Sequence, residues 1–121
     1  MGTEFRVWQI DNEKDEKRVC FLCLPFTRNH IHHDWIDKAP YEAVWHGTTR
    51  RPVSLDHIYG HFNKPENLQP GMRSLSVSDV VEIIQSDNLE PGFYFCDSIG
   101  WPKVEFREEE ESGEERESSS F

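Results

Sequence analysis

Two cysteines and three histidines lie close together in the first third of this 121-residue chain. Cys20 and Cys23 are separated by two residues, and His30, His32 and His33 follow within ten residues of Cys23. Thiolate sulfur and imidazole nitrogen are ligands that a tetrahedral zinc ion prefers. The pattern predicts a structural zinc site formed by Cys20, Cys23, His30 and His33, in which four protein ligands leave no position open for a substrate.

The residues between the two cysteines support a different interpretation. Phe21 and Leu22 are apolar, whereas zinc knuckles usually carry Gly or polar residues there. In an extended strand, residues three apart point to opposite faces, so Cys20 and Cys23 would not converge on one ion. Buried cysteines beside surface histidines are therefore the alternative, and the sequence leaves both open. Zinc is the one cofactor that the sequence suggests.

Other potential nucleophiles lack the partners of an active site. Cys96 ends the aromatic segment Tyr94–Cys96 and is expected to be a buried, inert thiol. The serines of Ser74–Ser78 alternate with apolar residues, as on the wet face of a strand. Asp79 is expected to accept hydrogen bonds from backbone amides at a bend. We therefore expect a protein that binds rather than an enzyme.

The charge of the chain bears on the class of its partner. The sequence has 23 Asp and Glu against 13 Lys and Arg, a formal net charge of −10. A protein that binds the phosphate backbone needs clustered cations, so direct nucleic-acid binding is not expected. A protein partner with a basic, nucleic-acid-binding surface fits better, and solubility alone is the alternative explanation of the acidity.

Much of the negative charge lies at the C-terminus. Residues 107–121 contain seven Glu, four Ser and almost nothing apolar, which predicts a disordered acidic tail. The partner-binding residues expected there are Glu108, Glu109, Glu110 and Glu111, whose carboxylates would imitate phosphate charge in a nucleic-acid channel. The alternative is a solubilising end without a target.

A second expected partner-binding group lies in the middle of the chain. Trp45 is followed closely by Arg50 and Arg51. Trp and Arg are the residue types that most often anchor protein interfaces. The sequence therefore predicts that Trp45, Arg50 and Arg51 contact a partner.

Hydrophobic periodicity indicates the elements that position these residues. Ser54 is a helix N-cap candidate, and Leu55, Ile58, Tyr59 and Phe62 form one apolar helical stripe. A single helical turn is expected near Ile31–Asp34. The segments expected to be strands are 5–10, 18–24, 41–45, 75–84, 93–96 and 103–106, with the first two paired as a hairpin and a bend near residue 79 in the fourth. Short links between them favour an α+β fold, in which an antiparallel or mixed sheet of about five to six short strands packs one main helix on one face.

The sequence resembles the YodL-like domain, a family found in Firmicutes, their phages and their mobile elements. The resemblance covers residues 5–106, so residues 1–106 are expected to form the domain and 107–121 the tail. The segments that carry it are Phe5–Trp8, Tyr41–Gly47, Leu55–Asn63, Ser74–Val81 and Tyr94–Trp101. Cys20, Cys23 and the three histidines are not part of that pattern.

The resemblance implies a mobile-element context and assigns no catalytic residue to this chain. In that context we expect an inhibitor that binds a host protein, most concretely an anti-CRISPR-type inhibitor of a nucleic-acid-binding nuclease that acts by occlusion. The alternative is a regulatory accessory module that binds a cytoskeletal or replication component. The chain has no run of ~20 apolar residues and no secretory signal, so a cytoplasmic protein without membrane contact is expected.

Overall fold

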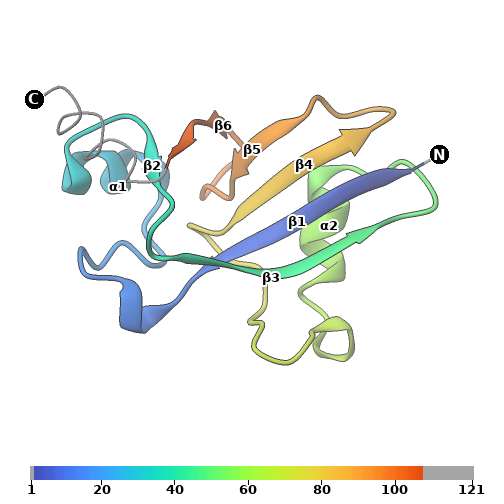
Figure 1. Cartoon of the computed structure of the whole chain (residues 1–121), viewed down its shortest axis with the longest axis horizontal. Helices are drawn as coiled ribbons and strands as arrows, with labels where there is room; N and C mark the ends of the chain where they lie inside the picture. The colour runs from blue at the N-terminus through green and yellow to red at the C-terminus, as the bar shows by residue number, and fades with distance from the viewer. Residues whose placement is uncertain (1, 108–121) are drawn as a thin grey trace, which may run out of the picture.

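The computed structural model describes residues 2–107. Its elements, in chain order, are β1 (Thr3–Ile10), η1 (Asn12–Lys14), α1 (Leu24–Ile31), β2 (Ile36–Asp37), β3 (Tyr41–Thr48), α2 (Leu55–His61), η2 (Pro65–Asn67), β4 (Val80–Ser86), β5 (Gly92–Phe95), β6 (Lys103–Val104) and β7 (Phe106–Arg107). Figure 1 shows α1 and α2 near opposite ends of the sheet. No helix in this range is long and apolar enough to cross a bilayer.

Five strands form one antiparallel sheet in the order β3-β1-β4-β5-β6. β1 lies between β3 and β4, with Val7 opposite both Trp45 and Val81. The short strands β2 and β7 form a separate parallel pair. The expected α+β class and sheet are confirmed, and α2 is the expected main helix.

α2 covers one face of the sheet. Alternate residues of β1 and β4, among them Phe5 and Val81, pack with Ile58 and Phe62 of α2 in one core cluster. This helix begins as the sequence predicts, because the Ser54 side chain accepts a hydrogen bond from the His57 amide at 3.0 Å.

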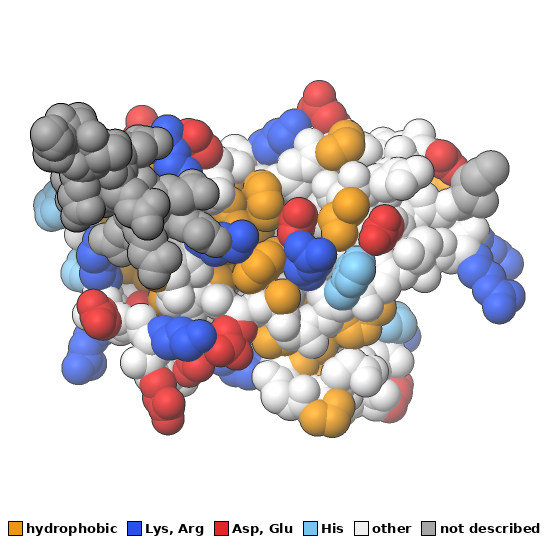
Figure 2. All heavy atoms as spheres, in the orientation of Figure 1, with side chains coloured by type: hydrophobic (Ala, Val, Ile, Leu, Met, Phe, Trp, Pro, Cys, Tyr) orange, Lys and Arg blue, Asp and Glu red, His pale blue; other side chains and the backbone are white. Residues whose placement is uncertain are grey.

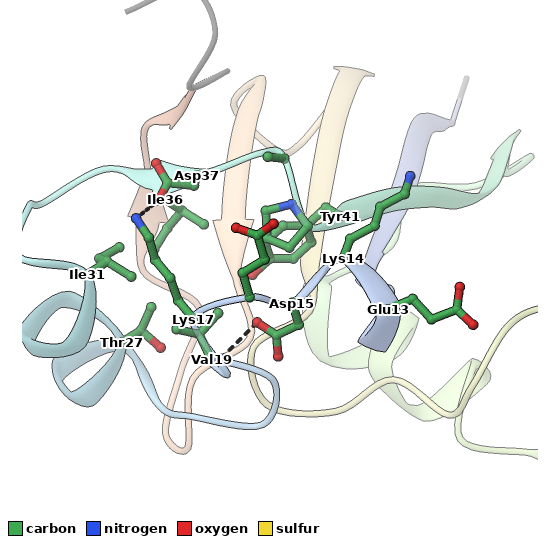
Figure 3. A pocket seen from close by; sticks show the side chains of 13 residues that line it. Glu13, Lys14, Asp15, Lys17, Val19, Thr27, Ile31, Ile36, Asp37 and Tyr41 are labelled. Carbon is green, nitrogen blue, oxygen red and sulfur yellow. Dashed lines mark hydrogen bonds and ion pairs between the residues drawn. The ribbon is translucent and has the colours of Figure 1, made fainter. Parts of the chain in front are cut away.

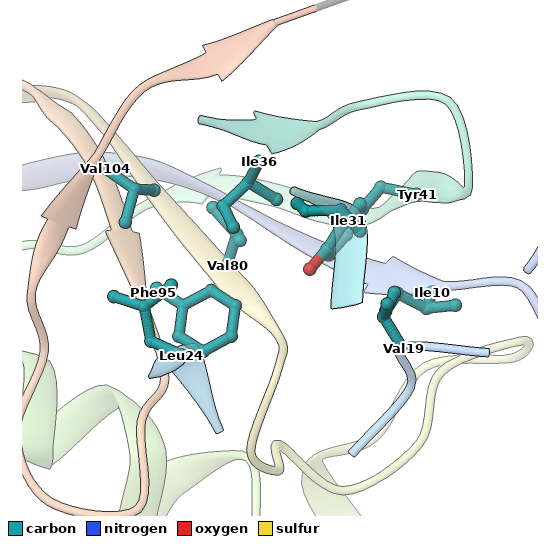
Figure 4. Packing of buried hydrophobic residues seen from close by; sticks show 9 residues of the cluster. All are labelled: Ile10, Val19, Leu24, Ile31, Ile36, Tyr41, Val80, Phe95 and Val104. Carbon is teal, nitrogen blue, oxygen red and sulfur yellow. The ribbon is translucent and has the colours of Figure 1, made fainter. Parts of the chain in front are cut away.

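The other face of the sheet is covered by α1 and nearby segments, at the end of the sheet away from α2 (Figure 1). Ile10 of β1 and Val80 of β4 contribute to a second cluster with residues of α1, β2 and the segment before α1 (Figure 4). Neighbouring residues of a strand point to opposite faces of the sheet. Val80 therefore belongs to this second cluster, and the next residue, Val81, belongs to the cluster under α2.

The expected strand at residues 18–24 is wrong, and so is its hairpin with the first strand. This segment is irregular and leads into α1, which has a Pro in its first turn. Pro25 follows the expected strand directly, and Pro is well suited to the first turn of a helix, where its missing N–H is not needed. The single turn expected near Ile31–Asp34 lies instead at the end of this helix, where His32 has a left-handed φ of 68°.

The expected strand at 75–84 begins later, at Val80. The residues before it form a turn in which Ser78 is 1% exposed and has φ 86°. Ser78 is therefore buried, and the expectation of a wet strand face at this position is also wrong. The bend near Asp79 is confirmed, because its Oδ2 accepts a hydrogen bond from the Ser76 amide at 2.8 Å.

Asp79 is a buried carboxyl group, with 0% of its surface exposed. Its Oδ2 also accepts a hydrogen bond from Gln9 Nε2 at 3.0 Å, whereas Oδ1 has no partner among the described residues. Burial raises the pKa of Asp79 to about 7, against the lowering effect of its hydrogen bonds and of Arg73.

This pKa predicts a stability that depends on pH. Because the folded state holds the Asp79 proton more tightly than the unfolded chain, the stabilisation is complete below about pH 4 and is lost as the pH rises to about 7. Asp79→Asn keeps an oxygen for the Gln9 and Ser76 hydrogen bonds and cannot ionise. Urea unfolding should show the native protein losing about 2–4 kcal/mol relative to Asp79→Asn between pH 5 and pH 8. A difference that does not change with pH would show that this carboxyl does not titrate there.

Candidate functional site

The four expected zinc ligands do not come together. Among residues 2–107, no three His, Cys, Asp or Glu side chains are placed to hold a metal ion. Both ring nitrogens of His33 already have partners, since Nδ1 lies 2.8 Å from the Trp35 carbonyl and Nε2 lies 3.3 Å from Asp37 Oδ2. Cys20 Sγ lies 3.8 Å from a guanidinium nitrogen of Arg73. This arrangement does not fit a tetrahedral zinc site.

The remaining cysteines have separate surroundings. Cys23 is the N-cap residue of α1 and makes no side-chain cap hydrogen bond, while His30 lies exposed in the last turn of the same helix. Cys96 is 3% exposed, and burial raises its pKa to about 12. The Cys96 thiol is therefore buried and protonated at neutral pH, as expected from its aromatic strand.

A cavity of about 500 Å³ opens beside η1. Lys17 spans it to reach Asp37 at 3.5 Å, and Asp15 accepts a hydrogen bond from the Val19 amide (Figure 3). Lys14, also on its rim, is paired with Glu42 at 2.8 Å. Both lysines of the rim thus have carboxylate partners, so this cavity offers a ligand little unpaired positive charge.

The expected partner-binding residues Trp45, Arg50 and Arg51 do come together. They line a groove of about 410 Å³ between the end of β3 and α2, which we call the basic groove. α2 contributes His57 and His61, four residues apart, to the same groove. Sequence reasoning missed these two histidines, although their spacing on a helix with a predicted apolar stripe is a usable signal.

Trp45 is held in place by packing. Its ring lies 4.6 Å from that of Phe5 and 5.3 Å from that of Phe62, centroid to centroid. It also lies across Gly47, where a Cβ atom would be 2.6 Å from the indole Cη2. The wall of the basic groove therefore depends on a glycine two residues after the tryptophan.

A second surface was not foreseen from the sequence. Four large apolar side chains of residues 2–107 are exposed, namely Phe21 (55%), Phe26 (65%), Tyr59 (40%) and Ile99 (90%). We call this set the apolar face. Periodicity assigned Phe21 and Tyr59 to buried positions, because an apolar residue on an expected strand or helical stripe is normally a core residue.

Contacts join the segments that carry the apolar face. The Phe21 amide donates to Ser78 Oγ at 2.9 Å, and the Leu24 amide at the start of α1 donates to Asp97 Oδ1 at 3.0 Å. Trp101, which follows the Ile99 turn, packs edge-on against Tyr59 at 6.3 Å. The 97–101 turn thus contacts the start of α1 through Asp97 and contacts α2 through Trp101.

Charges elsewhere are mixed. Acidic and basic side chains lie side by side over the face shown in Figure 2. Arg6 and Glu82, 3.0 Å apart on adjacent strands, are an example of oppositely charged neighbours. The described residues visible on that face form no extended surface of one sign (Figure 2), which a nucleic-acid backbone would require. The expected contacts at Glu108, Glu109, Glu110 and Glu111 lie outside the described residues.

Comparison with known proteins agrees with the sequence pattern. The model of the YodL-like domain matches residues 4–106. No curated protein and no solved structure matches the chain. The match covers most of the 121 residues, so the chain belongs to the YodL-like domain family.

The contact between Gly47 and Trp45 gives a testable prediction. Gly47→Ala should displace the indole and lower the free energy of unfolding by about 1–3 kcal/mol, the usual cost of overpacking. Gly60→Ala is the matched control, since a Cβ at this position in α2 meets nothing within 4 Å. The control should raise stability by about 0.5–1 kcal/mol. Urea unfolding of the two variants tests this, and equal stabilities would contradict the packing described.

Proposed function

We propose that this YodL-like domain is a non-enzymatic binding module that docks on a host protein through its apolar face and inhibits that protein by occlusion. The most concrete partner is a nuclease with a basic, nucleic-acid-binding surface. The observation that carries the proposal is the exposure of four large apolar side chains, Phe21, Phe26, Tyr59 and Ile99, around connected segments.

Exposure of this kind is costly unless a partner covers it. Single exposed apolar residues are ordinary, but a group of large ones on a small domain is typical of an interaction surface. Ile99 is 90% exposed at the tip of a turn that ends at Gly100, which has φ 83°. A polar residue could occupy the same position in this turn. The presence of an exposed isoleucine there is therefore an argument for contact with a partner.

The charges beside the apolar face favour a cationic partner. Asp56 and Asp97 line a small hollow there together with Tyr59 and Trp101. Trp101 Nε1 donates to Asp56 Oδ1 at 3.0 Å, which orients this carboxylate at the surface. Apolar side chains flanked by oriented carboxylates complement a surface on which apolar residues are surrounded by Lys and Arg.

Occlusion follows from this complementarity. A surface built to hold nucleic acid is cationic, and an acidic protein that docks beside it excludes the substrate without any chemistry. The net charge of −10 would increase the association rate with such a partner. Glu108–Glu111 would add to this attraction by occupying part of the phosphate-binding channel.

The test compares two variants of the full chain as bait in a host lysate. Phe26→Ser combined with Ile99→Ser removes the two most exposed side chains of the apolar face. Gln85→Ser, at an exposed position of β4, is the control. The native chain and the control should retain the same nucleic-acid-binding nuclease, identified by mass spectrometry, and the double variant should not.

Quantitative binding to the purified nuclease then tests the mechanism. The double variant should weaken binding at least about tenfold, as expected for loss of interface anchors. Replacing Glu108–Glu111 with Gln should weaken binding several-fold at low salt and less at high salt. Retention of only cytoskeletal or replication proteins would favour the regulatory accessory module instead. Equal retention by the double variant would show that the apolar face is not the docking surface.

A further inference from the structure

The basic groove has no part in docking through the apolar face, yet its composition is unusual for this protein. The chain is rich in Asp and Glu, but none of those within residues 2–107 lines the groove, whereas two arginines and two histidines do. A cavity that is lined by arginines and histidines, and by no carboxylates, is a site where an anion would be stabilised.

The two arginines project from an anchored loop. Thr49 exchanges hydrogen bonds with Thr3, through its amide at 2.9 Å and its hydroxyl at 3.0 Å. The same hydroxyl donates to the Arg51 carbonyl at 2.6 Å. No carboxylate of residues 2–107 forms an ion pair with Arg50 or Arg51. Their guanidinium groups are thus available to a ligand and are carried by a backbone that is already positioned.

The opposite wall of the basic groove is one side of α2. His57 and His61 are four residues apart, as are Ile58 and Phe62, so each pair lies on one side of the helix. The imidazoles add hydrogen-bond donors beside the arginines, and the buried pair Ile58 and Phe62 supplies an apolar floor.

Aromatic rings form both the floor of the groove and its Trp45 wall. Phe5, Trp45 and Phe62 pack against one another at tilted or edge-on angles, and all three line the groove. A site with an aromatic floor and a cationic rim can bind a ring through its apolar part and an anionic group through its charges.

We propose that the basic groove binds a small phosphate ester that carries an aromatic ring, of about the size of a mononucleotide. The phosphate contacts Arg50 and Arg51, with His57 and His61 as further donors, and the ring lies against the Trp45 wall. Arginine is suited to this task because its planar fork can donate two parallel hydrogen bonds to phosphate oxygens.

Size and charge favour a small ligand over a macromolecule. The volume of about 410 Å³ falls within the range of roughly 300–1,000 Å³ that is typical of small-molecule sites. A nucleic acid would carry many charges toward a protein of net charge −10, whereas a mononucleotide carries at most about two. The local cations can offset that smaller repulsion.

Calorimetric titration of the full chain with AMP tests the proposal. Inorganic phosphate and adenosine serve as the two halves of the probe, and a Glu-Glu-Glu-Phe peptide represents an acidic protein segment. AMP should bind at least about tenfold more tightly than either half, because charge and ring act together in one site. Arg50→Gln and Arg51→Gln should each weaken AMP binding about tenfold.

Arg18→Gln is the matched control, because it removes the same charge from an exposed position before α1 that does not line the groove. It should leave AMP binding within about twofold of the native value. An equal loss in this control would overturn the proposal, as would no AMP binding at millimolar concentration. Phosphate that binds as tightly as AMP, or a peptide that binds more tightly, would overturn it too.

Docking through the apolar face and ligand binding in the basic groove can be tested separately. The Phe26→Ser, Ile99→Ser double variant changes only exposed side chains outside the basic groove. It should therefore bind AMP like the native chain even though it no longer retains the host partner. Loss of AMP binding in this variant would contradict an independent groove.

Discussion

The buried carboxyl of Asp79 is the interaction on which the rest of the structure depends. Its Oδ2 joins Gln9 of β1 to the Ser76 amide, and its backbone carbonyl accepts a hydrogen bond from the Cys96 amide at 2.8 Å. The neighbouring Ser78 carbonyl accepts a hydrogen bond from Tyr41 Oη at 2.6 Å. One turn before β4 therefore connects β1, β3 and the end of β5, and the buried carboxyl holds this turn to β1 through Gln9.

The same turn positions the apolar face. Ser78 Oγ holds the Phe21 amide, and the Cys96 amide that reaches Asp79 directly precedes Asp97, whose side chain caps the first residue of α1. Residues that specify the fold thus also present the exposed apolar side chains. The basic groove depends on a different set of contacts at the other side of α2, around Trp45 and Gly47. A single domain can in this way carry two surfaces of opposite chemical character.

Sequence reasoning succeeded where local and tertiary signals agree. The cap at Ser54 and the stripe behind it identified α2, and the alternation at residues 5–10 identified β1. Trp45, Arg50 and Arg51 reach one groove because they lie close together in the chain. Sequence reasoning failed at residues 18–24, where a short apolar run with Val and Phe is typical of a strand. No strand partner is within reach there, since β3 and β4 already occupy both edges of β1.

The sequence by itself determined the family through its resemblance to a known domain. It also determined the α+β class, the main helix and the acidity of the chain, because these three follow from local periodicity, capping and composition. Only the tertiary structure decided which residues meet. It buried Ser78, which alternation assigned to a wet surface, and it left Phe26 and Ile99 exposed. It also separated the cysteines and histidines of the expected zinc site and placed His57 and His61 opposite the arginines. The physical reason is that burial and ligand geometry depend on contacts between segments distant in sequence, which local patterns do not encode.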